Sequence, residues 1–175
     1  EKNNLVLEIG SINKDQNISK IDLALGYIKK EALVEAIKKS VECRYGSLHL
    51  FQSDYAQKSN LKPDKLQKIL KNSYEQSNSK HMLNIQEHNN FDEIDLSTYG
   101  VIFLFNSTRN KAQKTLPSIN GKCLVIIGPE GGFSSAELAR FRQNEKLKQK
   151  THYFSANRIG SLTSWRREYS FFFWF

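Results

Sequence analysis

Residues 128–134 read Gly128-Pro129-Glu130-Gly131-Gly132-Phe133-Ser134, and Glu137 follows three positions later. An apolar run, 123–127, comes before this stretch, and an amphipathic segment, 134–141, comes after it. The order predicts a buried strand, a glycine-rich turn and then a helix. Ser134 and Glu137 have the spacing of a capping box at the start of that helix. Glycines allow a ligand to approach bare backbone, and turns at the carboxyl ends of strands are where open α/β sheets bind nucleotide-like ligands.

Two commoner nucleotide motifs do not fit this turn. A phosphate-binding P-loop requires Gly-Lys-Ser/Thr, and no lysine follows these glycines. The dinucleotide fingerprint requires G-x-G-x-x-G, whereas this turn has G-x-x-G-G with a proline and a glutamate inside it. Glu130 would repel phosphates, so an uncharged or cationic adenosine-type ligand fits better. The alternative is a tight strand-to-helix turn that binds no ligand.

The composition describes a globular chain. Its 175 residues suit one domain, and the 39% of apolar residues are enough for a core. No stretch has the length of a membrane span and no leader opens the chain, so we expect a cytoplasmic protein. Cys43 and Cys123 show neither metal spacing nor a disulfide framework, and the four histidines are scattered. The sequence therefore predicts no metal site.

The charge balance favours a polyanionic partner. Lysine and arginine number 26 against 18 acidic residues, which gives a net charge of +8. Such an excess is typical of proteins that bind nucleic acid. A lysine-rich, solvated surface is the alternative explanation.

Strands and helices alternate in the rest of the pattern. Strands are predicted at 21–28, 47–51, 82–85, 99–105, 123–127 and 151–155, and helices from 29, over 63–74 and after the glycine turn. Segment 89–98 is predicted to be a polar connection. Such alternation predicts an α/β fold with a mostly parallel sheet flanked by helices.

The motif resembles that of the ribosomal RNA small subunit methyltransferase E family, which belongs to the SPOUT methyltransferases. The family's Gly-Pro-Glu-Gly-Gly-Phe-Ser and following Glu are intact at 128–134 and Glu137, and its Glu-Gln-Ser is kept at 75–77. The resemblance implies transfer of a methyl group from S-adenosylmethionine to N3 of a uridine in bacterial 16S ribosomal RNA. It also implies a SPOUT-type fold with a C-terminal deep trefoil knot over 21–175, a homodimer, and a remnant of an N-terminal PUA-like RNA-binding barrel, or a linker, at 1–20.

The resemblance also implies which residues form the sites. Three loops would surround the cofactor, with contacts from Leu104, Phe105, Asn106, Ile127, Gly128, Glu130, Gly131, Gly132, Phe154, Ser155, Ala156 and Asn157. Glu130 is the candidate general base for the uracil proton, although a structural role at the turn is an equal possibility. Basic residues that would hold RNA are Lys29, Arg109, Lys111 and Lys114.

The C-terminal segment departs from the family. After Asn157 the family's Ile-Leu-Arg-x-Glu-Thr-Ala is replaced by another sequence, which ends in the aromatic run 171–175. This segment is either a lineage variant whose aromatics pack in a dimer interface or the product of a displaced reading frame from near Arg158. Membrane attachment by so short a run is disfavoured. Loss of the motif leaves a second functional hypothesis, a non-catalytic RNA-binding or dimerisation domain with a degenerate methyltransferase fold.

Overall fold

In the part of the chain that the structure describes, six parallel strands form one sheet in the order β3-β2-β1-β5-β4-β6. The computed structural model describes residues 19–57, 61–106, 121–144 and 151–155. The strands are β1 (Ile21–Gly26), β2 (Ser47–Phe51), β3 (Asn84–His88), β4 (Val101–Asn106), β5 (Cys123–Ile127) and β6 (Thr151–Ser155). The helices are α1 (Lys30–Glu42), α2 (Pro63–Ser77) and α3 (Ser135–Gln143), with short 3-10 helices η1 (Phe91–Glu93) and η2 (Leu96–Thr98). The predicted parallel α/β sheet flanked by helices is confirmed.

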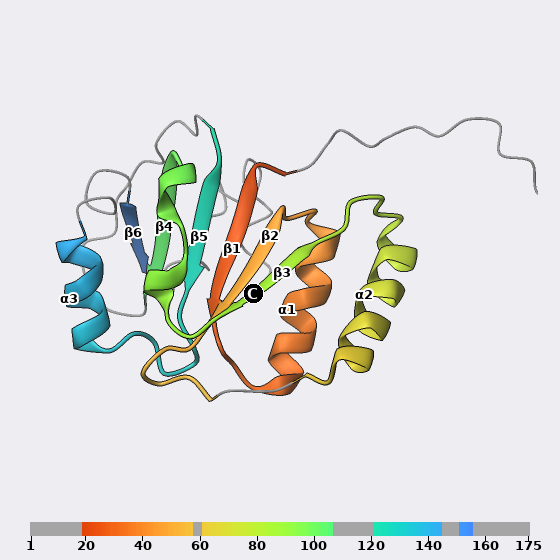
Figure 1. The fold of residues 1–175 in the computed structure, drawn as a ribbon, viewed down its shortest axis with the longest axis horizontal. Helices are drawn as coiled ribbons and strands as arrows, with labels where there is room; N and C mark the ends of the chain where they lie inside the picture. Colours follow the sequence, from red (N-terminus) through yellow and green to blue (C-terminus); the bar gives the residue numbers. More distant parts are fainter. Residues whose placement is uncertain (1–18, 58–60, 107–120, 145–150, 156–175) are drawn as a thin grey trace, which may run out of the picture.

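Helices cover both faces of the sheet (Figure 1). Side chains alternate between the faces along each central strand, because successive residues of a strand point in opposite directions. In β5, Cys123 and Val125 pack in the core under α1 and α2, whereas Leu124 and Ile126 pack in the core that contains Phe141 of α3. Burial on both faces explains why the central strands are continuous apolar runs in the sequence.

The edge strand β3 begins at Asn84, two residues after the start of the predicted strand 82–85, so the predicted bounds are wrong. Met82 is 77% exposed, and the Leu83 N–H donates to the Tyr74 hydroxyl at 2.9 Å instead of joining a neighbouring strand. Pairing starts at Asn84, which lies opposite Ser47. Because β3 is mostly polar and exposed, the apolar pattern could not locate it. The predicted polar connection 89–98 contains η1 and η2.

The carboxyl ends of β1 and β5 form a switch point in the sheet. These two strands pair side by side, with Leu25 opposite Ile127. β1 leads into α1 on one face and β5 leads toward α3 on the other face. Ligands of open α/β sheets bind where the connections diverge in this way. The glycine-rich turn lies at this position.

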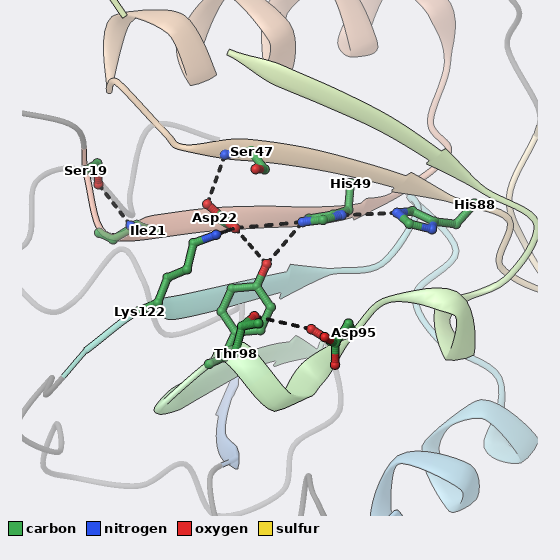
Figure 2. Close-up of polar contacts among 10 residues, drawn as sticks. Ser19, Ile21, Asp22, Ser47, His49, His88, Asp95, Thr98 and Lys122 are labelled. Atoms are coloured by element: carbon green, nitrogen blue, oxygen red, sulfur yellow. Dashed lines mark hydrogen bonds and ion pairs between the residues drawn. The ribbon is translucent and has the colours of Figure 1, made fainter. Parts of the chain in front are cut away.

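A buried carboxylate joins the amino ends of several strands. Asp22 of β1 is fully buried, and its Oδ1 accepts the Ser47 N–H of β2 at 2.9 Å. Its Oδ2 accepts the Tyr99 hydroxyl at 2.6 Å and pairs with Lys122 Nζ at 2.6 Å. Figure 2 shows Lys122 on one side of Asp22, and His49 and then His88 on the other. Ser47 begins β2, Tyr99 lies just before β4 and Lys122 lies just before β5, so Asp22 connects β1 to the starts of three other strands.

The contacts of Asp22 keep its carboxylate ionised. Burial by itself would raise the pKa of Asp22, but hydrogen bonds from His49, Lys122 and Tyr99 lower it and prevail. The pKa therefore lies below its ordinary value. A group whose pKa is lowered in the folded state stabilises the fold at pH values above its unfolded-state pKa.

Replacing Asp22 is expected to destabilise the whole sheet. Asp22→Asn removes the charge that Lys122 and Tyr99 compensate, so we expect the free energy of unfolding to fall by about 2–3 kcal/mol. Urea unfolding followed by circular dichroism measures this change. Asp64→Asn, an exposed aspartate in the first turn of α2, is the control and should cost less than about 1 kcal/mol. Equal losses in the two variants would contradict the role of Asp22.

The same carboxylate predicts how stability depends on pH. Its contribution is complete above an unfolded-state pKa of roughly 3.9 and is lost as the pH falls through the lower folded-state pKa. The stability difference between the wild type and Asp22→Asn should therefore shrink below about pH 4. Unfolding curves of both proteins between neutral and strongly acidic pH test this expectation. A difference that stays constant over that range would exclude Asp22 as the titrating group.

Candidate functional site

Three glycines leave much of the turn after β5 without side chains of its own. Gly132 has a φ of 73°, a left-handed conformation that glycine adopts without strain, and its N–H donates to the Pro129 carbonyl at 2.8 Å. A Cβ on Gly131 would lie 3.0 Å from the Cβ of Tyr55. The glycines therefore let the turn close tightly against the loop that follows β2.

The end of β1 packs directly against this turn. A Cβ on Gly26 would lie 2.8 Å from Pro129 Cδ and 3.1 Å from Pro129 N. Real Cβ contacts are almost never that short, so any other residue at position 26 would push the turn away from β1. The neighbouring Glu130 also binds this region, since its Oε1 accepts the Lys29 N–H at 3.0 Å. Lys29 precedes α1 as its N-cap residue.

Glu130 therefore has a structural contact of its own. The α1 N-cap lacks a side-chain cap from Lys29, and the Glu130 carboxylate supplies an acceptor there from a distant part of the chain. The backbone hydrogen bond from Lys29 is the main cause that lowers the pKa of Glu130. A lowered pKa makes a carboxylate a weaker proton acceptor. The turn role foreseen as an alternative is thus visible in the structure, and the general-base role stays a prediction.

The start of α3 is tied to the loop after β2. The predicted capping box is present: Ser134 Oγ accepts the Glu137 N–H at 3.1 Å, and Glu137 Oε2 accepts the Ser134 N–H at 2.8 Å. Glu137 Oε1 also accepts the Asp54 N–H at 3.2 Å, and Ser134 Oγ donates to the Asp54 carboxylate. Glu137 is buried, so both its oxygens are used inside the protein. Asp54 thereby fixes the β2 loop beside the turn.

The strand register brings the predicted cofactor residues together. Phe105 of β4 lies opposite Ile127 of β5 on one side and opposite Phe154 of β6 on the other. Asn106 lies opposite Ser155 in the next row. Leu104 is buried, and its partner in β5 is Ile126. Three strand ends predicted to surround one ligand are therefore adjacent at the carboxyl edge of the sheet.

Some predicted residues lie outside the described part of the chain. Among them are Ala156 and Asn157 of the third loop, the basic residues Arg109, Lys111 and Lys114, and the C-terminal segment in which a knot was expected. Lys29 is described and exposed at the start of α1.

Sequence reasoning missed Asp54 and Tyr55. Both follow the carboxyl end of β2, and Tyr55 is 57% exposed although it contacts the glycine turn. The signal for them was topological: loops that follow parallel strands meet at one edge of the sheet, so residues after 47–51 should have been considered together with residues after 123–127.

Two negative observations apply to the described ranges. In these ranges no helix is both long enough and apolar enough to cross a membrane. The same residues contain no group of three or more His, Cys, Asp or Glu side chains placed to hold a metal ion.

Solved structures share this fold at low sequence identity. A ribosomal RNA small subunit methyltransferase E from Neisseria gonorrhoeae, bound to S-adenosylmethionine, aligns over 85% of this chain with a TM-score of 0.62 and 14% identity. A probable rRNA-methyltransferase from Porphyromonas gingivalis aligns over 83% with a TM-score of 0.66 and 19% identity. A presumed methyltransferase from Legionella pneumophila, in complex with the same cofactor, aligns over 77% with a TM-score of 0.58 and 18% identity. This chain spans 65%, 62% and 57% of those three proteins, respectively.

Sequence comparisons give the family. No curated protein sequence matches this chain. The family model described as the RNA methyltransferase domain matches residues 14–149, which include the glycine turn and five of the six strands. The chain therefore belongs to the RNA methyltransferase domain family.

Proposed function

We propose that this chain transfers a methyl group from S-adenosylmethionine to RNA, and that the acceptor is N3 of a uridine in 16S ribosomal RNA. The observation that supports the proposal most directly is the position of the glycine turn, beside the adjacent carboxyl ends of β4, β5 and β6. The family match and the cofactor bound to two proteins of the same fold support it further.

The residues at this edge fit the proposed cofactor. Phe105 and Ile127 are half-buried apolar side chains at the strand ends, suited to contact an adenine ring. Gly128, Gly131 and Gly132 carry no side chains, so their backbone groups other than the Gly132 N–H, which donates to Pro129, are proposed to bond the polar edge of the adenine. The exposed carboxylate of Glu130 suits a cationic sulfonium and disfavours a phosphate. In this proposal Leu104, Asn106, Phe154, Ser155, Ala156 and Asn157 complete the three loops.

The mechanism requires mainly positioning from the protein. S-adenosylmethionine supplies a methyl group that its sulfonium already activates. The residues of the turn hold the donor, and contacts through Pro129 and Glu130 fix the turn on β1 and α1. Holding two reactants in line contributes up to roughly 7–11 kcal/mol in favourable systems. The uracil N3 proton must also leave; Glu130 is the candidate acceptor, but its lowered pKa and its bond to the Lys29 N–H favour the structural role over this one.

RNA contacts and assembly are part of the same proposal. Lys29 lies exposed beside the turn, and Arg109, Lys111 and Lys114 follow β4 in the sequence. We propose that these four residues bind RNA phosphates, that the catalytic unit is residues 21–175, and that the active form is a homodimer.

A non-catalytic RNA-binding domain is the second candidate function, favoured by the loss of the family's C-terminal motif after Asn157. Calorimetry with S-adenosylmethionine, followed by methylation of unmodified 16S ribosomal RNA, separates the two candidates.

Two glycines with left-handed backbone provide a matched test of the cofactor site. Gly132→Ala should lower the affinity for S-adenosylmethionine about five- to thirtyfold, because a strain of about 1–2 kcal/mol opens the turn that is proposed to face the donor. Gly121→Ala imposes a similar strain, because Gly121 has a φ of 91°. Gly121 lies just before β5, at the amino ends of the strands, and a Cβ there would have no atoms within 4 Å. This variant should leave the affinity unchanged. Isothermal titration calorimetry on both variants checks this, and equal losses of affinity would contradict the assignment of the turn.

Substitutions of Glu130 separate its structural and catalytic roles. Glu130→Gln keeps an acceptor for the Lys29 N–H, so we expect methylation within about threefold of wild type, whereas Glu130→Ala removes the acceptor and should raise KM for the cofactor. Loss of a general base would instead lower kcat by roughly 10²–10⁴-fold in both variants. Steady-state methylation of unmodified 16S ribosomal RNA, with thermal melting of each variant, distinguishes the outcomes. A collapse of kcat in Glu130→Gln at unchanged stability would establish the base role.

A further inference from the structure

A groove runs between α1 and α2, on the face of the sheet opposite to α3. It has a volume of about 410 Å³, and residues of these two helices line it. The helices lie side by side, and both begin at the carboxyl edge of the sheet, because each follows a parallel strand and returns over its face (Figure 1). One end of the groove therefore lies at the edge that carries the glycine turn. None of the residues proposed above to bind the cofactor or RNA lines it.

The accessible polar side chains of this groove all carry N–H donors. They are Lys38 of α1 and, from α2, Lys65, Lys68, Asn72 and Gln76. The four residues of α2 recur every three or four positions, so they form one exposed stripe that extends about 16 Å along the helix. Lysine only donates hydrogen bonds, and each carboxamide adds two donors. No acidic residue is among the described residues that line the groove.

The floor of the groove is apolar and requires no partner from a ligand. Val34 is half-buried and Ile69 is buried. Ser73 also lines the groove, but its hydroxyl is buried and donates to the Ile69 carbonyl at 2.8 Å. Recognition of a ligand therefore depends on the exposed nitrogens along the two walls.

Two of the three lysines have no acidic partner. Lys65 and Lys68 make no ion pair with any carboxylate that the structure describes, whereas Lys38 pairs with Glu35 at 2.6 Å. Lys71, on the same helix, lies 4.0 Å from a glutamate and does not line the groove. Uncompensated positive charge beside further N–H donors complements an anion that offers acceptors only. A phosphodiester chain is such an anion.

We propose that this groove binds the sugar–phosphate backbone of the RNA substrate where the strand leaves the glycine turn. The inference rests on the proposed function for its partner, RNA, and not for the methyl transfer. Lys29 and Lys62, exposed at the N-caps of α1 and α2, continue the positive charge from the groove to the carboxyl edge. A stripe of donors about 16 Å long suits successive phosphates of one strand. Phosphate contacts position a nucleic acid without reading its sequence, so the groove would hold the strand that flanks the target base.

Removing the two uncompensated lysines tests the proposal. Lys65→Gln/Lys68→Gln is compared with Lys71→Gln/Lys80→Gln, which removes the same charge from exposed positions outside the groove. Binding of a fluorescein-labelled rU decamer to the full chain is measured by anisotropy at several salt concentrations. We expect the groove variant to bind roughly tenfold more weakly at low salt, and its slope of log affinity against log salt to fall by about 1.4, because each phosphate contact of a single strand contributes about 0.7. The control should stay within about twofold of wild type, with an unchanged slope.

The location of the bound strand is read independently by NMR. Addition of the decamer to ¹⁵N-labelled protein should shift the side-chain amides of Asn72 and Gln76, which line the groove. Equal salt slopes in the two double variants, unchanged Asn72 and Gln76 signals, or no binding of the decamer to wild type would each overturn the proposal. Tighter binding of a decaglutamate peptide than of the decamer would also overturn it, and would assign the groove to an acidic protein partner.

Calorimetry with S-adenosylmethionine separates failure of the groove from failure of the proposed function. The groove variant should bind the cofactor as wild type does, because none of its substitutions lies at the glycine turn. A chain that binds the cofactor but shows no effect at Lys65 and Lys68 loses only the groove. A chain that binds no cofactor loses the methyltransferase assignment, whereas a loss of RNA affinity at these two lysines would still support the groove.

Discussion

The buried carboxylate of Asp22 is the interaction on which the sheet depends. A charge without contact to solvent is tolerated only when it is paired and hydrogen-bonded, and Asp22 meets this condition with groups from three other segments of the chain. Because Ser47, Tyr99 and Lys122 all lead into strands, the single carboxylate sets where β2, β4 and β5 begin relative to β1. A Cβ on Gly46 would lie 2.7 Å from Asp22 Oδ1, so the backbone after α1 is also shaped around this group.

The alignment at the amino ends determines what meets at the carboxyl ends. Parallel strands that start in register finish in register, and this brings Gly26 against Pro129 and Phe105 beside Ile127. Hydrogen bonds from backbone N–H groups to carboxylates then fix the loops: Glu130 accepts from Lys29 before α1, and Glu137 accepts from Asp54 in the loop after β2. The acidic residues at this edge therefore serve largely as acceptors for backbone N–H groups. They place the loops without any regular pairing between strands.

Local patterns in the sequence predicted the centre of this architecture and missed its periphery. The glycine turn and the capping box depend on residues close together in the chain, and both are present as expected. β5 was located because burial on both faces requires an apolar run, whereas β3 at the sheet edge has no such requirement. Asp22 and Asp54 were missed because their partners lie 25 to 100 positions away, and no spacing rule connects them. Such residues are found only once the strand order is known.

The distribution of charge indicates where phosphates lie in the proposed RNA complex. A net charge of +8 attracts a polyanion over a long range, and contacts to phosphates do not depend on sequence. A cavity between the loop after β2, the loop after β3 and α3 has the opposite local character, because Asp54, Asp92 and Glu137 are among the residues that line it. The basic surface would therefore supply affinity for RNA phosphates that does not depend on sequence, and the acidic residues would keep those phosphates out of this cavity.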